Sequence, residues 1–151
     1  MQRVARAEVE VDSACVGHIG RGLLVYLGVS VDDDAQDARR LADKVAGLRI
    51  FEDPAEKMNL SVRDVGGGVL AVPNFTLMAD ARKGRRPAFV AAARPEQAEP
   101  LYEAFVDALR DLGCEVAVGK FCAHMNIRSD ADGPVNIILE MPPAETGPGG
   151  R

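Results

Sequence analysis

The chain has 151 residues, a formal net charge of −5 and 47% hydrophobic residues, a composition typical of one globular domain. Its three cysteines, Cys15, Cys114 and Cys122, form no CxxC pair, which argues against a disulfide framework and a structural zinc site. No apolar run approaches the roughly 20 residues of a membrane-spanning helix, and residues 1–12 lack the apolar core of a signal peptide. We therefore expect a cytoplasmic protein.

The first half of the chain is predicted to form two strands and one helix. In residues 2–12 apolar and polar residues alternate, which is the period of a half-buried strand. Residues 22–30, GLLVYLGVS, form an apolar run typical of a buried strand, and a hairpin turn containing His18 is expected before it. In residues 32–51 the apolar spacing changes to three and four, which predicts a helix capped by its leading aspartates. Residues 52–68 are predicted to be a loop.

A third strand and a second helix are predicted next. Residues 69–72 are an apolar run that stops at Pro73, as expected for a buried strand and its end. Residues 95–113 carry apolar residues at helical spacing and finish on glycine, which is favourable just past a helix. Because two prolines stand near its start, this helix is expected to begin close to Pro100.

The last part of the chain is predicted to add two strands. These are residues 114–127 and 134–141, joined by a turn over residues 128–133. The tail, residues 142–151, has nothing apolar to bury and is expected to be disordered. The order of elements predicts an α+β fold, with a curved, mostly antiparallel or mixed β-sheet and two α-helices in a single domain over residues 1–141.

Familiar catalytic groups are scarce in this sequence. Cys122 and His124 fall on the same face of a predicted strand, and such neighbours rarely align for proton transfer. Asp130 and Asp132 lie in the predicted turn, where aspartate is favoured for its own backbone hydrogen bonds. The sequence has neither HExxH nor a glycine-rich phosphate loop, so we expect no metal and no nucleotide cofactor.

Two polar segments at strand boundaries remain as candidates for a site. Asn74, Phe75 and Thr76 end a buried strand and lead into a cluster of four positive charges in residues 82–86. The second segment is DGPVN, residues 132–136. Taken singly, each is ordinary strand-end chemistry, and a basic cluster is as often solvated surface as a binding patch.

These segments belong to a larger pattern. The sequence resembles the D-aminoacyl-tRNA deacylases over nearly its whole length. The matching runs are QRV (2–4), GHIGRGLLVYLGV (17–29), LADKVAGLRIFED (41–53), KMNLSVRDVGG (57–67), FTLMADARKGRRPAF (75–89), AEPLYEAFVDALRDLG (98–113) and DGPVNIIL (132–139). So many runs in one order are a more specific signal than any single motif.

The resemblance implies a barrel-like homodimer that hydrolyses the ester between a D-amino acid, or glycine, and the terminal ribose of tRNA. This is a chirality-proofreading step in translation, and in the family it uses no metal or cofactor. An aminoacyl ester is already activated, so positioning and oxyanion stabilisation matter more than a strong base. Such a site holds few of the usual catalytic side chains, as here.

The resemblance also implies which residues form the site. In the family two motifs meet across the dimer interface, and here they fall on residues 73–77 and 131–136. The Gly–Pro bond of the second is cis in the family, and its carbonyls face the amino acid's α-amino group. Catalysis is expected from Phe75 and Thr76, through main-chain amides and the Thr76 hydroxyl. Substrate binding is expected from Asn74, Gly133, Pro134, Val135, Phe89 and Arg3. Of these, Arg3 matches a family arginine that holds the Gly–Pro segment. Contact with tRNA phosphates is expected from Arg82, Lys83, Arg85 and Arg86.

Four positions depart from the family motifs. Pro73 stands in place of Ser, Asn74 in place of Gln, Ala131 in place of Asn and Asn136 in place of Thr. The sequence therefore leaves three functions open. They are deacylation of D-aminoacyl-tRNA and Gly-tRNA, deacylation of a different mischarged tRNA such as L-Ala-tRNA, and a catalytically silent dimeric RNA-binding module.

Overall fold

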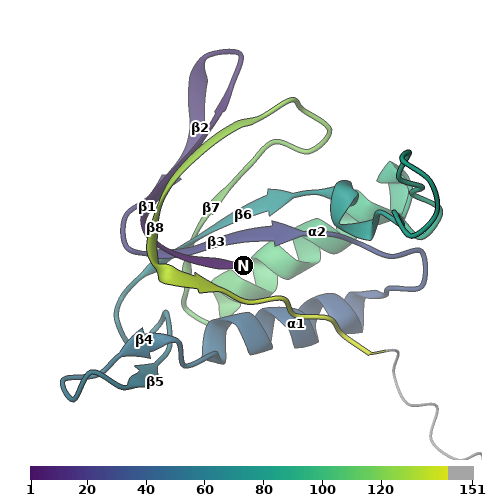
Figure 1. Cartoon of the computed structure of the whole chain (residues 1–151). Coiled ribbons are helices and arrows are strands. Elements are labelled where there is room, and N and C mark those ends of the chain that lie inside the picture. The colour runs from purple at the N-terminus through teal and green to yellow at the C-terminus, as the bar shows by residue number, and fades with distance from the viewer. Residues whose placement is uncertain (143–151) are drawn as a thin grey trace, which may run out of the picture.

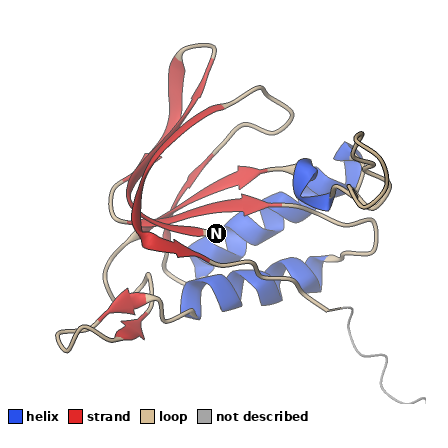
Figure 2. Ribbon diagram, in the orientation of Figure 1, coloured by secondary structure: helices blue, strands red, loops and turns tan. Residues whose placement is uncertain are grey.

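The computed structural model describes residues 1–142, and residues 143–151 of the predicted tail lie outside that range. Two helices pack on one side of a strongly curved mixed sheet, which confirms the predicted α+β fold (Figures 1 and 2). Within residues 1–142, neither helix has the length and apolar character that crossing a bilayer demands. The elements are β1 (Gln2–Val11), β2 (Ala14–Ile19), β3 (Gly22–Leu27), α1 (Ala35–Gly47), β4 (Phe51–Glu52), β5 (Met58–Leu60), β6 (Gly68–Pro73), the 3₁₀ helix η1 (Phe75–Met78), α2 (Pro95–Asp111), β7 (Glu115–Val118) and β8 (Asn126–Asn136).

The main sheet has the strand order β2-β1-β3-β6-β7, and β8 pairs with β1 as well. Strand β1 is antiparallel to β2, β3 and β8, whereas β3, β6 and β7 run parallel. The sheet curls until β2 approaches β7 (Figure 1). At that approach a Cβ on Gly17 would lie 2.5 Å from the Val118 carbonyl oxygen, so only glycine lets the sheet come this near to closure.

The parallel strands β3 and β6 are buried on both faces, which explains their continuous apolar sequences. Leu23 and Val25 of β3 pack with the helices in one core, together with Phe105 of α2. The alternate residues Leu24 and Leu70 pack inside the curl of the sheet in a second core. The period of two along each strand therefore divides the apolar side chains between two cores.

The two helices begin at different kinds of signal. The Asp34 side chain accepts hydrogen bonds from the N–H groups of Gln36 and Asp37 at 2.7 and 3.0 Å, which confirms the predicted acidic cap of α1. Helix α2 begins at Pro95, not near Pro100 as predicted. A proline suits the first helical position because it lacks only an N–H that has no intrahelical partner there.

Three predictions about the strands were wrong. Strand β2 was not predicted, and exposed His18 lies on it rather than in a turn. The predicted loop 52–68 contains the short strand β5, which pairs with β4. The predicted turn 128–133 lies inside β8, which ends at Asn136, so no separate strand spans residues 134–141.

The reason for the error in β8 is charge pairing across strands. Asp130 accepts a hydrogen bond from Arg6 of β1 at 2.7 Å, and Arg128 pairs with Glu8 and Glu10 at 3.0 and 2.6 Å. Polar residues that look like a turn in isolation are thus matched by opposite charges on the neighbouring strand.

Candidate active site

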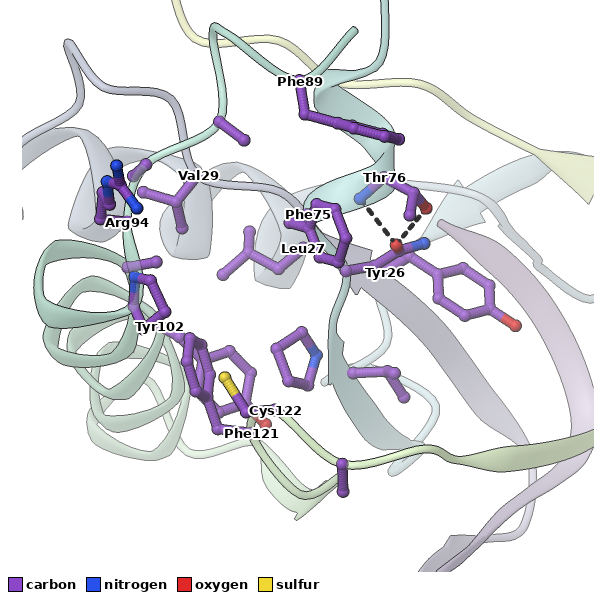
Figure 3. A pocket seen from close by; sticks show the side chains of 18 of the residues that line it. Tyr26, Leu27, Val29, Phe75, Thr76, Phe89, Arg94, Tyr102, Phe121 and Cys122 are labelled. Carbon is purple, nitrogen blue, oxygen red and sulfur yellow. Dashed lines mark hydrogen bonds between the residues drawn. The ribbon is translucent and has the colours of Figure 1, made fainter. Parts of the chain in front are cut away.

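A cleft of about 1070 Å³ opens at the carboxyl ends of β3 and β6 (Figure 3). Its walls are the strand ends, η1, residues 89–95, the start of α2 and residues 121–125. Most of the lining side chains are apolar or aromatic, with Tyr26, Tyr102 and Phe121 among them. Such a cavity suits an organic group that is oriented by a few polar contacts.

The first motif enters this cleft where β6 ends. Pro73 pairs with Leu27 of the parallel strand β3, and the next N–H, that of Asn74, donates to the Leu27 carbonyl at 2.8 Å. Successive residues of a strand point their N–H groups to opposite sides, so the Pro73 nitrogen faces the side where β7 has already ended. Proline therefore costs no ladder hydrogen bond here, which explains how it ends the strand without disrupting the sheet.

Asn74 organises the turn that follows. Its side-chain oxygen Oδ1 accepts a hydrogen bond from the Thr76 N–H at 3.1 Å and a second, short one from the Thr76 hydroxyl (Figure 3). Both Thr76 donors are thus engaged by one atom in this structure. The Phe75 N–H, by contrast, donates to no group within residues 1–142.

Two aromatic rings stand at the mouth of the cleft. The rings of Phe75 and Phe89 meet edge to face, with centroids 5.1 Å apart, and their side chains remain 59% and 36% exposed. Val90 beside them is 88% exposed. The sequence places Phe75 and Phe89 fourteen positions apart, and the structure brings them together as an exposed apolar rim.

The basic segment forms the tip of a closed loop next to this rim. Asp80 and Ala88 exchange two backbone hydrogen bonds at 2.7 and 2.9 Å, which closes the loop. Arg82 binds the Asp80 carboxylate through Nε at 2.9 Å and Nη2 at 2.7 Å; this pair raises the pKa of Arg82 and lowers that of Asp80. Lys83, Arg85 and Arg86 are exposed and have no ion-pair partner in the described part of the chain. These three carry the charge available to an anionic partner.

The second motif lies at the far end of β8. The Gly133–Pro134 peptide bond is cis, and Gly133 has φ +132°, where an added Cβ would lie 2.7 Å from the Val135 nitrogen. Only glycine fits this position. Buried Arg3 donates from Nε to the Asp132 carbonyl at 3.2 Å and from Nη1 to the Ile50 carbonyl at 2.8 Å. Arg3 therefore holds the backbone immediately before the Gly–Pro step.

One chain does not bring the two motifs together. Asn74, Phe75, Thr76 and Phe89 line the cleft, whereas Gly133, Pro134 and Val135 do not. Val135 is buried in the helix-side core, and its strand end lies apart from η1 in Figure 1. The first motif and the aromatic rim thus form half of the predicted site.

Several residues of the cleft were not foreseen from the sequence. The Tyr102 hydroxyl donates to the Ala71 carbonyl at 2.9 Å, and burial raises the pKa of Tyr102 to about 12. Cys122 and His124 line the cleft from the loop after β7, not from a strand, and Cys122 has φ +56°. In the sequence, the only sign of Tyr102 is its place in the apolar spacing of α2, which indicates burial and not a cleft. Among residues 1–142, no three His, Cys, Asp or Glu side chains gather where they could hold a metal ion.

Comparison with known proteins finds matches over nearly the whole chain. Residues 1–140 match the family model described as D-Tyr-tRNA(Tyr) deacylase. A D-aminoacyl-tRNA deacylase of Anaeromyxobacter dehalogenans is 60% identical, over 93% of this chain and 94% of the relative. One from Symbiobacterium thermophilum is 56% identical, over 93% of each chain. A solved structure titled c-Myc DNA unwinding element binding protein has a TM-score of 0.87 and 39% identity, covering 93% of this chain and 96% of that one.

The family model and these relatives therefore identify the chain as a hydrolase that acts on aminoacylated tRNA. More particularly, the chain belongs to the D-Tyr-tRNA(Tyr) deacylase family, which confirms the resemblance found in its sequence.

Proposed function

We propose that this D-aminoacyl-tRNA deacylase cleaves D-aminoacyl-tRNA and Gly-tRNA in the cleft beside Phe75, chiefly with main-chain groups of a single domain over residues 1–141. The observation that carries the proposal is the Phe75 N–H, a main-chain donor without a partner within residues 1–142, at a residue that lines the cleft. A donor held in place before the reaction stabilises the charge that develops on an ester oxygen.

The chemistry needs little from side chains. Water adds to the ester carbonyl carbon, and the carbonyl oxygen becomes an oxyanion that accepts from the Phe75 N–H. The bond to the ribose oxygen then breaks, and the proton of the attacking water passes to that oxygen, with the neighbouring ribose 2′-hydroxyl as relay. The scarcity of histidine and carboxylate groups around the cleft is consistent with this scheme.

We place the second motif in the cleft of a partner copy. Within one chain Gly133 and Pro134 do not line the cleft, although the family motif is complete apart from its two departures, Ala131 and Asn136. In a two-fold symmetric dimer each cleft receives this segment from the other subunit. The carbonyls of Gly133 and Pro134 then accept hydrogen bonds from the α-amino group of the substrate. The side chain of an L-amino acid would clash with this rigid backbone, so the L ester is excluded.

The tRNA backbone is proposed to contact the loop closed by Asp80 and Ala88. Lys83, Arg85 and Arg86 at its tip are exposed and unpaired within the described chain, next to the mouth of the cleft. Phosphates on this loop place the 3′ end of the tRNA near Phe75 and Phe89. Because aminoacyl-tRNA is used in the cytoplasm, we place the reaction there.

The test is deacylation of D-Tyr-tRNA, L-Tyr-tRNA, Gly-tRNA and L-Ala-tRNA by chelator-treated protein. Cleavage of the D-tyrosyl and glycyl esters, with the two L esters intact, is the expected result. Cleavage of L-Ala-tRNA instead would show that Pro73 and Asn74 mark a shifted substrate. Cleavage of none, with tRNA binding retained, would show a silent RNA-binding module.

The shared site has its own test. One inactive variant removes the Phe75 N–H (Phe75→Pro), at the first position of η1, where proline is tolerated. The other alters Gly133 (Gly133→Ala). If each cleft takes one motif from each chain, a heterodimer of the two has one intact site. Unfolding and refolding an equal mixture should then restore about a quarter of wild-type activity, because half of the dimers are mixed and each has one working site of two. No recovery, with heterodimers detected, contradicts the shared site.

A further inference from the structure

We infer that Asn74 is a positioning residue which makes Thr76 a hydrogen-bond acceptor toward the substrate, and leaves donation to the Phe75 N–H. The inference rests on the proposed function, since it assigns roles within that cleft. It differs from the expectation drawn from the sequence, in which the Thr76 hydroxyl supplies a donor.

The orientation of the Asn74 amide follows from its partners. The Thr76 N–H can only donate, so the atom it meets at 3.1 Å must be the side-chain oxygen of Asn74 and not its nitrogen. The Thr76 hydroxyl meets the same oxygen and therefore also donates to it. A hydroxyl has one proton and two lone pairs, so the proton is used and the lone pairs remain.

Asn74 is itself held firmly. Its N–H donates to the Leu27 carbonyl of β3 at 2.8 Å, and its own carbonyl accepts from the Leu77 N–H at 3.4 Å. The side chain thus connects the end of the buried sheet to Thr76 through a short, branched set of hydrogen bonds. Thr76 is exposed and lines the cleft, so its orientation relative to a bound ester depends on this connection.

The consequence for the reaction is a division of roles. With its proton on Asn74, the Thr76 oxygen can accept from the attacking water or from a ribose hydroxyl and orient it toward the ester carbon. Repulsion between oxygens keeps Thr76 away from the oxyanion, which faces the Phe75 N–H. The departure of this chain from the family glutamine matters here, because asparagine is one methylene shorter and folds back on the second residue after it.

The experiment compares Asn74→Ala, Asn74→Asp and the control Asp34→Ala. Asp34 is matched to Asn74 because its side-chain oxygen also accepts from two donors within three residues, but it caps α1 and does not line the cleft. We measure kcat and KM on D-Tyr-tRNA, the melting temperature, and the hydrogen-exchange rate of the Thr76 amide. The effect of Asn74→Ala is also measured in a Thr76→Val background.

The expected result separates positioning from stability. Asn74→Ala should lower kcat about 100-fold with little change in KM and speed exchange of the Thr76 amide, since a misplaced group costs about this much. Asn74→Asp, which keeps an acceptor, should retain kcat within about 10-fold of wild type. Asp34→Ala should lower the melting temperature and leave kcat unchanged. In the Thr76→Val background, Asn74→Ala should cost much less than it does alone.

Two outcomes overturn the inference while the proposed function stands. One is an active wild type whose kcat survives Asn74→Ala. The other is an equal loss from Asn74→Ala with or without Thr76→Val. If Asn74→Ala does not fold, failure of Asn74→Asp to retain activity overturns it instead. An inactive wild type is a different result, because it refutes the proposed function and the role of Asn74 together.

Discussion

Arg3 offers the sharpest test of how the second motif is held. Its side chain is 7% exposed and donates to two backbone carbonyls, those of Asp132 and Ile50. Replacing it by methionine keeps the apolar stem but leaves both carbonyls without their charged donor. Hydrogen bonds to charged groups contribute about 1.5–3 kcal/mol each, so loss of both in Arg3→Met should lower the free energy of unfolding by about 3–6 kcal/mol.

Arg6 on the same strand is the matched control for Arg3. It also pairs with an aspartate of β8, Asp130, at 2.7 Å, but its side chain is 76% exposed. Exposed pairs contribute about 0–1 kcal/mol, so Arg6→Met should be nearly neutral. Urea unfolding at one fixed protein concentration compares the two, because dimerisation makes stability concentration-dependent. A difference below about 1 kcal/mol between the two variants would refute the reasoning, since the buried carbonyl bonds would then contribute almost nothing.

Three further predictions follow from single contacts. Gly22→Ala should destabilise the fold by about 3 kcal/mol or more, because its Cβ would lie 1.9 Å from a carbonyl oxygen of β6. A Cβ on Gly47 would meet nothing within 4 Å apart from its own helix backbone and chain neighbours, so Gly47→Ala should raise stability in urea unfolding by up to about 1 kcal/mol. Arg85→Ala should flatten the dependence of log(kcat/KM) on log salt by about 0.7–0.9, and Arg82→Ala should change it less because Arg82 is paired within its loop. The pKa of Tyr102 is raised from 10.0 to about 12, so the folded state favours its neutral form; the stability it contributes is present below pH 10 and lost as pH rises toward 12. Tyr102→Phe should therefore remove part of the alkaline loss of stability, and an unchanged alkaline profile would contradict this.

The sequence predicts best where a pattern is local. The helix spacing and acidic cap of α1, and the apolar runs of β3 and β6, are each contained in about a dozen residues or fewer, and the structure confirms them. Strand β8 was predicted wrongly because it is stabilised by β1, more than 100 residues away in the sequence. Arginine and acidic side chains of the two strands form ion pairs with each other. Cross-strand pairing of this kind leaves no periodic signal in either strand alone.

In the candidate site, too, the parts set by local sequence were predicted and the parts set by three-dimensional contacts were not. The resemblance to a family located Phe75 and Thr76, and the structure places both on a cleft. The role of Asn74 could not be predicted, because it depends on which of two amide atoms faces Thr76 and on where the chain turns after β6. Tyr102 was hidden for another reason: on a helix, a cleft-lining tyrosine has the same spacing as a core residue.

The position of β1 has a consequence for the order in which the protein is made. Among the strands of residues 1–142, β1 is synthesised first and pairs with three others, whereas its partner β8 is synthesised last; Gln2 pairs with Asn136. Until β8 emerges, one edge of β1 has no partner, and Arg3 has no Asp132 to hold. The sheet and the Gly–Pro segment are therefore completed together, late, and by contacts of long sequence separation, which fold slowly. A nascent chain stalled before residue 126 exposes an open sheet edge, and we expect it to depend on chaperones more than the finished protein does.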